Sequence, residues 1–287
     1  MKLSDYKEIL IVGLGVIGGG YAKALTDKGY KVSCITLEQG DIDYAVERGM
    51  ISYGTTEVEP ELVARCGLVI FALYPTTFVE WIGKYQHLFN TGTVITDVTG
   101  VKTSVVYEVQ QMLRPDVEFI AAHPMAGRER SGVEYSDPTV FLGANYIVTP
   151  TEKNTPEAIA LCRELGDVLG FAKISELSPE EHDAMIAFLS QLTHCIAVVL
   201  MNCNQKDGLE KYTGDSFRDL TRIAKINDRM WSELFLQNKD ALLAEMDSFI
   251  EEFEAFREML ATGDGEGMRE KMRASTKRRS LFDKPKV

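Results

Sequence analysis

Short apolar runs alternate with more polar segments over residues 1–177 of the chain. The segments between the runs, such as 76–88 and 100–113, predict helices. Alternating strands and helices are typical of a doubly wound α/β sheet, and the run at 66–75, apolar throughout, suits a central parallel strand. The runs that predict strands lie at 7–12, 30–36, 66–75, 93–98, 118–122, 144–149 and 170–174.

The pattern changes at Ser178, where Ser178, Pro179 and Glu181 match a helix capping box. From this point the sequence predicts helices alone. We therefore expect two domains, an α/β sheet domain at 1–177 and an all-α domain at 178–287. The helices of the second domain are predicted at 182–204, 216–226, 228–237 and 239–262.

The helix predicted at 239–262 carries a wide apolar stripe at helical spacing. Such a stripe fits the core of a helical domain, and its length also suits a subunit interface. We therefore expect a homodimer formed through the helical domain. The residues of the stripe are Met246, Phe249, Ile250, Phe253, Phe256 and Leu260.

A glycine-rich turn at 13–18 separates the first predicted strand from a helix. Gly13 permits the tight turn, Gly15 lets the backbone approach a pyrophosphate, and Gly18 lets the helix pack on the strand. The first N–H groups of the helix then face the phosphates, where the helix dipole favours negative charge. Strand, glycine turn and helix in this order predict a Rossmann-type dinucleotide-binding domain.

The second predicted strand ends at Thr36, where such a domain usually places an acidic residue against the ribose hydroxyls. Glu38 follows two residues later, and the residues after it offer no Arg or Lys to neutralise the 2′-phosphate of NADP. We therefore expect NAD, with NADP as the alternative. The residues expected at the dinucleotide are Gly13, Gly15, Val16, Ile17, Gly18, Thr36, Glu38 and Asp97.

Charge and cysteine content narrow the possible partners. A formal net charge of −12 argues against nucleic acid or an anionic membrane. The five cysteines form no CxxC pair, so we expect neither a disulfide framework nor a metal site, and a reducing cytoplasmic location fits best. No long apolar segment opens the chain, so no secretory signal is expected. The apolar stretch at 185–201 contains polar residues, and we expect a helix buried in protein rather than a membrane span.

Three groups of polar residues could carry chemistry. His123 follows a predicted strand and is either structural or a catalyst beside the nicotinamide. The polar residues at 190–194 interrupt an apolar helix, which indicates either a satisfied core network or the wall of a site. Arg218 and Arg222 are four residues apart and are expected on one helix face. They form either a solvated charged surface or a site for carboxylates.

Five motifs occur in an order that resembles the prephenate dehydrogenase family of tyrosine biosynthesis. They are the glycine turn, His-Pro-Met-Ala-Gly at 123–127, Glu-His-Asp at 181–183, His194, and the run from Phe217 to Trp231. The resemblance implies a dimer with an active site between a nucleotide domain and a helical domain. It also implies hydride transfer from prephenate to NAD with loss of the ring carboxylate as CO2.

The resemblance assigns roles to individual residues. His123 matches the catalytic histidine, which accepts a hydrogen bond from the substrate hydroxyl. Arg222 matches the arginine that binds a substrate carboxylate, with Arg218 in support. The other residues expected at the substrate are His194, Ser190, Gln191, Thr99 and Glu129.

Two positions depart from the family pattern. Gly100 stands where the family has a serine, so Thr99 is expected to replace that hydroxyl, and Gln191 stands where the family has a histidine. Both changes leave open whether the substrate is prephenate or arogenate. Two other readings are a dinucleotide-responsive binding protein without turnover and a 3-hydroxyacid dehydrogenase. The helical half contains no catalytic lysine motif of the latter type.

Overall fold

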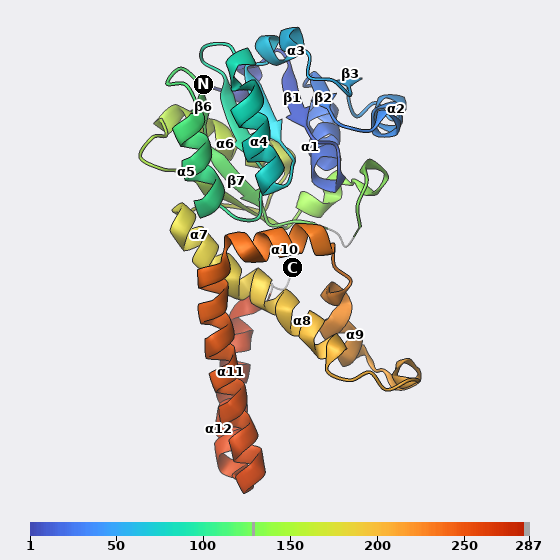
Figure 1. Cartoon of the computed structure of the whole chain (residues 1–287), viewed down its shortest axis with the longest axis vertical. Helices are drawn as coiled ribbons and strands as arrows, with labels where there is room; N and C mark the ends of the chain where they lie inside the picture. Colours follow the sequence, from blue (N-terminus) through green and yellow to red (C-terminus); the bar gives the residue numbers. More distant parts are fainter. Residues whose placement is uncertain (128–129, 284–287) are drawn as a thin grey trace. The chain divides into compact units, whose positions relative to one another are not determined.

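The computed structural model describes residues 1–127 and 130–283. The chain divides into two compact units, Met1–Lys239 and Asp240–Val287. The first unit contains all the strands among these residues and the helices that surround them, and the second is helical (Figure 1). The domain boundary expected at 177/178 lies inside the first compact unit. The division into a nucleotide domain and a helical domain at this point stays a prediction.

The main sheet of the first unit is parallel, and its strands follow the order β3-β2-β1-β4-β5-β6. This is the order of Rossmann dinucleotide domains, in which the ligand binds where the strand order reverses, between the first and fourth strands. Its strands are β1 (Ile9–Val12), β2 (Val32–Ile35), β3 (Tyr53–Thr55), β4 (Leu68–Phe71), β5 (Val94–Asp97) and β6 (Glu118–Phe119).

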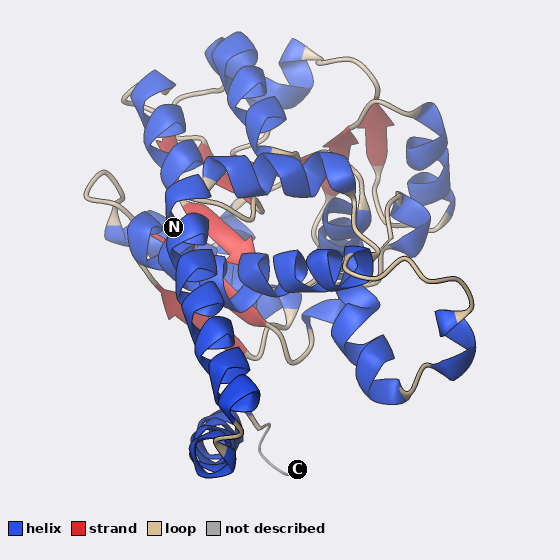
Figure 2. Cartoon of the chain, turned by 60° about the horizontal axis from the view of Figure 1, so that its bottom comes forward, coloured by secondary structure: helices blue, strands red, loops and turns tan. Residues whose placement is uncertain are grey.

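Helices cover both faces of this sheet (Figure 2). The side chains of β1 alternate between two apolar cores, because Ile9 and Ile11 belong to one core and Leu10 and Val12 to the other. The α-helices of both units, among the described residues, are α1 (Val16–Asp27), α2 (Gln39–Glu47), α3 (Pro60–Arg65), α4 (Pro75–Tyr85), α5 (Thr103–Met112), α6 (Pro156–Leu169), α7 (Pro179–Ile186), α8 (Thr193–Asn202), α9 (Asp215–Thr221), α10 (Asp228–Gln237), α11 (Lys239–Thr262) and α12 (Gly265–Arg279).

A second sheet departs from the expectation of one continuous sheet. It contains β7 (Ala121–Pro124), β8 (Asn145–Thr149) and β9 (Lys173–Glu176), with β7 antiparallel to β8. The strand predicted at 118–122 is therefore divided between two sheets. At the end of β5, the Asp97 carboxylate accepts the Ala122 N–H at 3.1 Å. This side-chain bond takes the place of the backbone hydrogen bond that would continue the pairing with β5.

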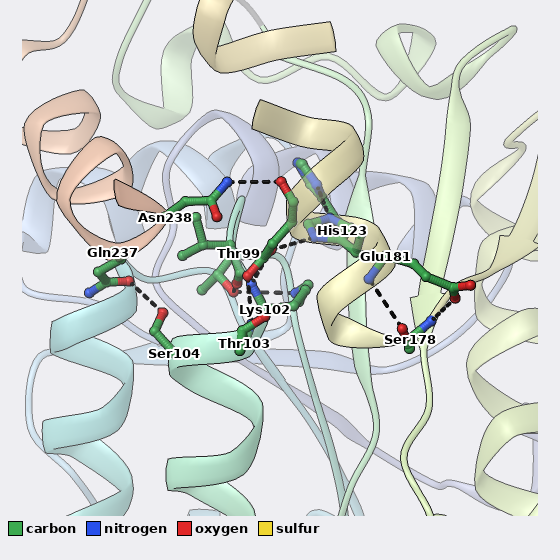
Figure 3. Close-up of polar contacts among 12 residues, drawn as sticks. Thr99, Lys102, Thr103, Ser104, His123, Ser178, Glu181, Gln237 and Asn238 are labelled. Atoms are coloured by element: carbon green, nitrogen blue, oxygen red, sulfur yellow. Dashed lines mark hydrogen bonds and ion pairs between the residues drawn. The ribbon is translucent and has the colours of Figure 1, made fainter. Parts of the chain in front are cut away.

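The strand-free second half begins with the predicted capping box. The Ser178 hydroxyl accepts the Glu181 N–H at 3.1 Å, and the Glu181 carboxylate accepts the Ser178 N–H at 2.9 Å (Figure 3). The helix expected at 182–204 is interrupted by a π-helical turn at Ala187–Leu192. By length and composition alone the run Pro179–Asn202 could cross a membrane, and 28% of its most apolar window is buried in the chain.

Helix α10 lies against the carboxyl edge of the main sheet (Figure 1). Leu234 of α10 is buried in the core shared with β4 and β5. The Glu233 carboxylate accepts the Thr76 N–H at 2.6 Å in the first turn of α4, where the helix dipole favours a negative charge. Helix α10 therefore joins the helical half of the first unit to its sheet.

The second unit contains α12 and nearly all of α11. An ion pair joins Glu252 of α11 to Lys271 of α12, and Asp264 caps the start of α12. The apolar stripe predicted on α11 is largely exposed in the single chain. Phe253 is 64% exposed and Leu260 is 65% exposed.

Candidate active site

The glycine turn has the geometry that a bound pyrophosphate requires. Gly13 has a φ of 95°, and a Cβ there would lie 2.4 Å from the Ala72 carbonyl oxygen. A Cβ on Gly18 would lie 2.1 Å from the Gly13 carbonyl oxygen, so the helix packs closely on the turn. Gly15 precedes α1 directly, and apart from its two chain neighbours no atom of the described residues lies within 4 Å of the position of its Cβ. This open backbone at a helix N-terminus fits a dinucleotide phosphate.

The other residues predicted at the dinucleotide lie along the same edge, with one exception. Val16 and Ile17 form the first turn of α1, Thr36 follows β2 directly, and Glu38 is the exposed residue that precedes α2. These positions are compatible with phosphate and ribose contacts. Their contacts with the cofactor stay a prediction.

The exception is Asp97, which the structure places in a buried ion pair. Its side chain and that of Lys102 are both 0% exposed, with Lys102 Nζ 2.7 Å from Asp97 Oδ2. The other carboxylate oxygen accepts the Ala122 N–H. The structure thus gives Asp97 an internal role, because both of its oxygens bind donors of the protein. Its contact with the cofactor stays a prediction.

Thr99 belongs to the same buried cluster (Figure 3). Its hydroxyl hydrogen-bonds the Asp97 carboxylate and lies 3.2 Å from Lys102 Nζ. Lys102 also donates to the Ala122 carbonyl at 2.6 Å, directly before His123. The expectation that Thr99 replaces a substrate-binding serine is therefore not supported, because Thr99 supports the backbone that carries His123.

His123 lies at the start of a chain of three polar side chains. Its Nδ1 is 2.8 Å from Nε2 of His182, and Nδ1 of His182 is 2.8 Å from Oδ1 of Asp183. Asp183 also accepts the backbone N–H groups of Lys102 and Thr103, each at 2.8 Å. Figure 3 shows His123 beside Lys102 and Thr99. These contacts join β7, α7 and the N-terminus of α5.

The pKa values of this chain favour a neutral imidazole. The pKa of His123 is well below its ordinary value of 6.5, because the protein desolvates the ring and because His182 and Lys102 would oppose a positive charge. Burial also lowers the pKa of His182. Burial alone would raise the pKa of Asp183, but hydrogen bonds from His182 and the Thr103 backbone lower it on balance. At neutral pH, Asp183 is thus ionised and His123 is a neutral ring able to accept a proton.

His194 is held by the π-helical turn and by α10. Its Nδ1 lies 2.8 Å from the Ser190 carbonyl oxygen, which can only accept, so this nitrogen carries the hydrogen. The ring stacks on Trp231 with centroids 3.7 Å apart. The π-helical turn therefore supplies the carbonyl that binds one nitrogen of His194, and α10 supplies the ring on which it stacks.

Gln191 is buried, and both ends of its side-chain amide bind other parts of the chain. It is 1% exposed, its amide nitrogen donates to the Leu234 carbonyl at 3.0 Å, and its amide oxygen accepts from Asn238 at 2.8 Å. The expectation that Gln191 binds substrate is therefore not supported. It holds α10 against the π-helical turn.

The two arginines lie on consecutive elements. Helix α9 ends at Thr221, and Arg222 begins a 3-10 turn, Arg222–Ala224, that packs against α8. Arg218 is exposed and binds Asp215 at 2.6 Å and the Thr213 carbonyl at 3.0 Å. The common face expected for Arg218 and Arg222 stays a prediction. Glu129 lies outside the described residues.

Helix α10 connects the two histidines predicted in the site. A Cβ built on Gly100 would lie 3.9 Å from His123 Nε2 and 3.5 Å from both Cδ atoms of Leu234, while Trp231, one turn earlier on α10, stacks on His194. No sequence pattern assigned a role to His182, Asp183 or Lys102. The available signal was their polarity: His182 and Asp183 open an apolar helix, and Lys102 follows a buried strand.

Comparison with known protein families agrees with this geometry. Residues 21–173 match the prephenate dehydrogenase nucleotide-binding domain, and residues 178–274 match the prephenate dehydrogenase dimerization domain. The chain belongs to the prephenate dehydrogenase family. The predicted family and the predicted fold class, a Rossmann-type domain followed by a helical domain, are thereby confirmed.

Individual members of the prephenate dehydrogenase family match nearly the whole chain. Prephenate dehydrogenase of Bacillus subtilis (strain 168) is 30% identical over 271 residues, which are 91% of this chain and 72% of the relative. Cyclohexadienyl dehydrogenase of Zymomonas mobilis is 28% identical over 284 residues, 96% of each chain. The crystal structure of prephenate dehydrogenase from A. aeolicus in complex with hydroxyphenyl propionate and NAD+ has a TM-score of 0.88 at 30% identity, covering 96% of this chain and 98% of that one.

Proposed function

We propose that this chain is an oxidoreductase that converts prephenate to 4-hydroxyphenylpyruvate with NAD, in tyrosine biosynthesis. The observation that carries the proposal is the His123 imidazole, which is held through Nδ1 on β7, next to the residue that binds the carboxyl end of β5, in a member of this family. A neutral ring in that position can accept the hydrogen of the substrate hydroxyl as a carbonyl forms, an effect typically worth roughly 10²–10⁴ in rate.

The cofactor would be held by the glycine turn. Gly13, Gly15 and Gly18 would receive the pyrophosphate at the N-terminus of α1, and Thr36 and Glu38 would face the ribose at the end of β2. Bound NAD supplies the hydride acceptor. The protein then has to orient the ring of prephenate, hold its carboxylates, and take up one proton from the hydroxyl.

Substrate binding is assigned to the helical side of the site. Arg222 would bind a carboxylate of prephenate, since a guanidinium can donate two parallel hydrogen bonds to it. His194 and Ser190 would line the pocket, because the π-helical turn and Trp231 hold His194 close to α10. Aromatisation of the ring, with release of CO2, would drive the reaction forward.

We also propose that the protein is a soluble, cytoplasmic homodimer. The match of residues 178–274 to a dimerization domain and the exposed apolar stripe on α11 support the dimer. The exposed part of Pro179–Asn202 would then be covered by protein rather than by lipid. Sedimentation of the purified protein at micromolar concentration should give twice the chain mass of 32.1 kDa, and a monomer would contradict the proposal.

The decisive experiment measures initial rates of NADH or NADPH formation with prephenate and with arogenate, each with NAD and with NADP. We expect the highest kcat/KM for prephenate with NAD. A preference for arogenate would correct the substrate, and the absence of turnover with all four pairs at high enzyme concentration would refute the activity.

Two variants test the residue roles. His123→Asn should lower kcat by roughly 10²–10⁴ with little change in KM, and Arg222→Ala should mainly raise the KM for prephenate. Matched controls are His87→Asn, at an exposed histidine, and Arg163→Ala, at a half-exposed arginine of α6 that pairs with Glu176. Both controls should leave kcat/KM within about twofold, the scatter expected of surface changes remote from the substrate.

A further inference from the structure

A buried histidine and aspartate behind His123 have no role in the proposed chemistry so far. His182 is 0% exposed and Asp183 is 4% exposed, and both belong to α7. They connect His123 to the N-terminus of α5 through the four contacts of 2.8 Å already described. A buried imidazole is costly unless both of its nitrogens are satisfied, and here both are.

The directions of these hydrogen bonds follow from the Asp183 carboxylate. An ionised carboxylate can only accept, so Nδ1 of His182 must carry the hydrogen that it shares with Asp183. In the neutral ring, Nε2 of His182 then has a lone pair, and the hydrogen in the next bond must come from Nδ1 of His123. His123 is left with its lone pair on Nε2, the nitrogen that lies 3.9 Å from the Cβ position of Gly100.

We propose that His182 and Asp183 are positioning residues that fix the tautomer and ring orientation of His123, so that Nε2 is the atom that accepts the substrate proton. The proposal rests on the proposed dehydrogenase function. When the hydroxyl proton moves to Nε2, His123 becomes an imidazolium whose Nδ1–H still donates to His182. No other proton has to move, and the new positive charge is partly balanced by Asp183 two hydrogen bonds away.

The other charged groups around His123 make this support necessary. Lys102 lies within its electrostatic reach and opposes the imidazolium, while the Asp97 carboxylate is already paired with Lys102. Among the described residues, Asp183 is therefore the carboxylate that hydrogen bonds link to His123, through His182. Without His182, the ring could flip or adopt the other tautomer, and Nε2 would then carry a hydrogen that blocks it as an acceptor.

The test compares three substitutions of His182. Gln places an amide oxygen near the position of Nε2 and can still accept from His123, whereas Asn reaches only the position of Nδ1 and Leu offers no acceptor. We expect His182→Leu and His182→Asn to lower kcat by roughly 10²-fold, as for the loss of a tautomer-fixing group. His182→Gln should recover at least tenfold of that loss, and the KM for NAD should stay within about twofold in all three.

The pH profile gives a second readout. Because the pKa of His123 is lowered, its neutral form should predominate down to below pH 6.5, and kcat should fall only as the pH drops through the lowered value. With His182 neutral, its Nε2 accepts the Nδ1 hydrogen of His123 and links the ring to the Asp183 carboxylate, which favours the imidazolium. Replacing His182 by Leu should therefore move the acid limb of kcat to lower pH, whereas Ser178→Ala should leave the limb in place.

Ser178→Ala is the matched control. It removes the hydroxyl that caps α7 and should cost about 1 kcal/mol of stability without touching His123. Its kcat should equal that of the wild type. If His182→Leu does not fold, the comparison of Gln with Asn decides the question. If His182→Gln and His182→Asn both fold and have equal kcat while the wild type is active, the positioning role is overturned. If the wild type itself is inactive, the dehydrogenase function is overturned instead.

Discussion

The two edges of the main sheet both hold a carboxylate in an ion pair, but they hold it differently. At the amino edge, Glu8 binds Ser33 and pairs with Lys31 at 2.8 Å and Arg65 at 3.2 Å. The side chains of Lys31 and Arg65 are 54% and 45% exposed. At the carboxyl edge, the paired side chains of Asp97 and Lys102 are entirely buried.

This difference separates a structural ion pair from one that supports a site. Half-exposed partners keep most of their hydration, so the Glu8 cluster can form at little cost. A fully buried pair loses that hydration and is often no more stabilising than apolar residues of the same size. The buried pair at the carboxyl edge is explained by its contact with the site, because Lys102 donates a hydrogen bond to the Ala122 carbonyl directly before His123.

The largest effect is expected from breaking the buried pair. Lys102→Met leaves the Asp97 charge without its partner and should lower the free energy of unfolding by about 3–5 kcal/mol. It should also lower kcat, because the backbone before His123 loses a hydrogen bond. Urea unfolding and initial rates measure the two effects. A loss below about 1 kcal/mol would show that the two edges are energetically alike.

Substitutions of two glycines at the carboxyl edge separate an effect on stability from an effect on cofactor binding. Gly18→Ala places a Cβ 2.1 Å from the Gly13 carbonyl and should destabilise the fold. Gly15→Ala meets no protein atom within 4 Å and should fold normally. It should instead weaken NAD binding by at least about tenfold, or 1.4 kcal/mol, since the methyl group occupies phosphate space. Calorimetric titration with NAD distinguishes the two, and normal affinity in Gly15→Ala would place the phosphates elsewhere.

The smallest effect is expected at the amino edge. Glu8→Gln should cost roughly 1 kcal/mol at neutral pH and leave kcat unchanged. The cluster lowers the pKa of Glu8 from 4.5 to about 2. A lowered pKa means that the stabilisation is complete above pH 4.5 and is lost as the pH falls toward 2. Unfolding of both proteins at pH 7 and at pH 3 should therefore show a smaller difference at pH 3.

Strands were predicted best from the sequence where both of their faces are buried. The runs around β1 and β4 were identified because apolar side chains occupy every position, and the run around β5 because it opens with Val94 and Ile95. Strand β3 was missed because its residues are partly exposed and it is only three residues long. The separation of β7 from the main sheet depends on one side-chain contact, from Asp97 to Ala122, that no local pattern records.

The candidate site was predicted in part. His123 and the glycine turn follow from their position after strands, because ligands of such sheets bind at the carboxyl ends. Asp97 and Thr99 were assigned to ligands because a polar residue at a strand end has the same pattern whether it faces a cofactor or a buried lysine. Gln191 was misassigned for a similar reason, since its partners lie more than forty residues away on α10 and in Asn238.

The π-helical turn at Ala187–Leu192 makes the chain sensitive to its exact length. Such a turn holds one residue more than the α-helical turn in its place. Deleting a single residue within it would give a more regular helix, yet every later side chain would rotate by about 100° around the axis. His194 would then leave the Trp231 ring. A scaffold borrowed from this protein for redesign therefore has to conserve the residue count between Ile186 and Thr193 as strictly as the histidines themselves.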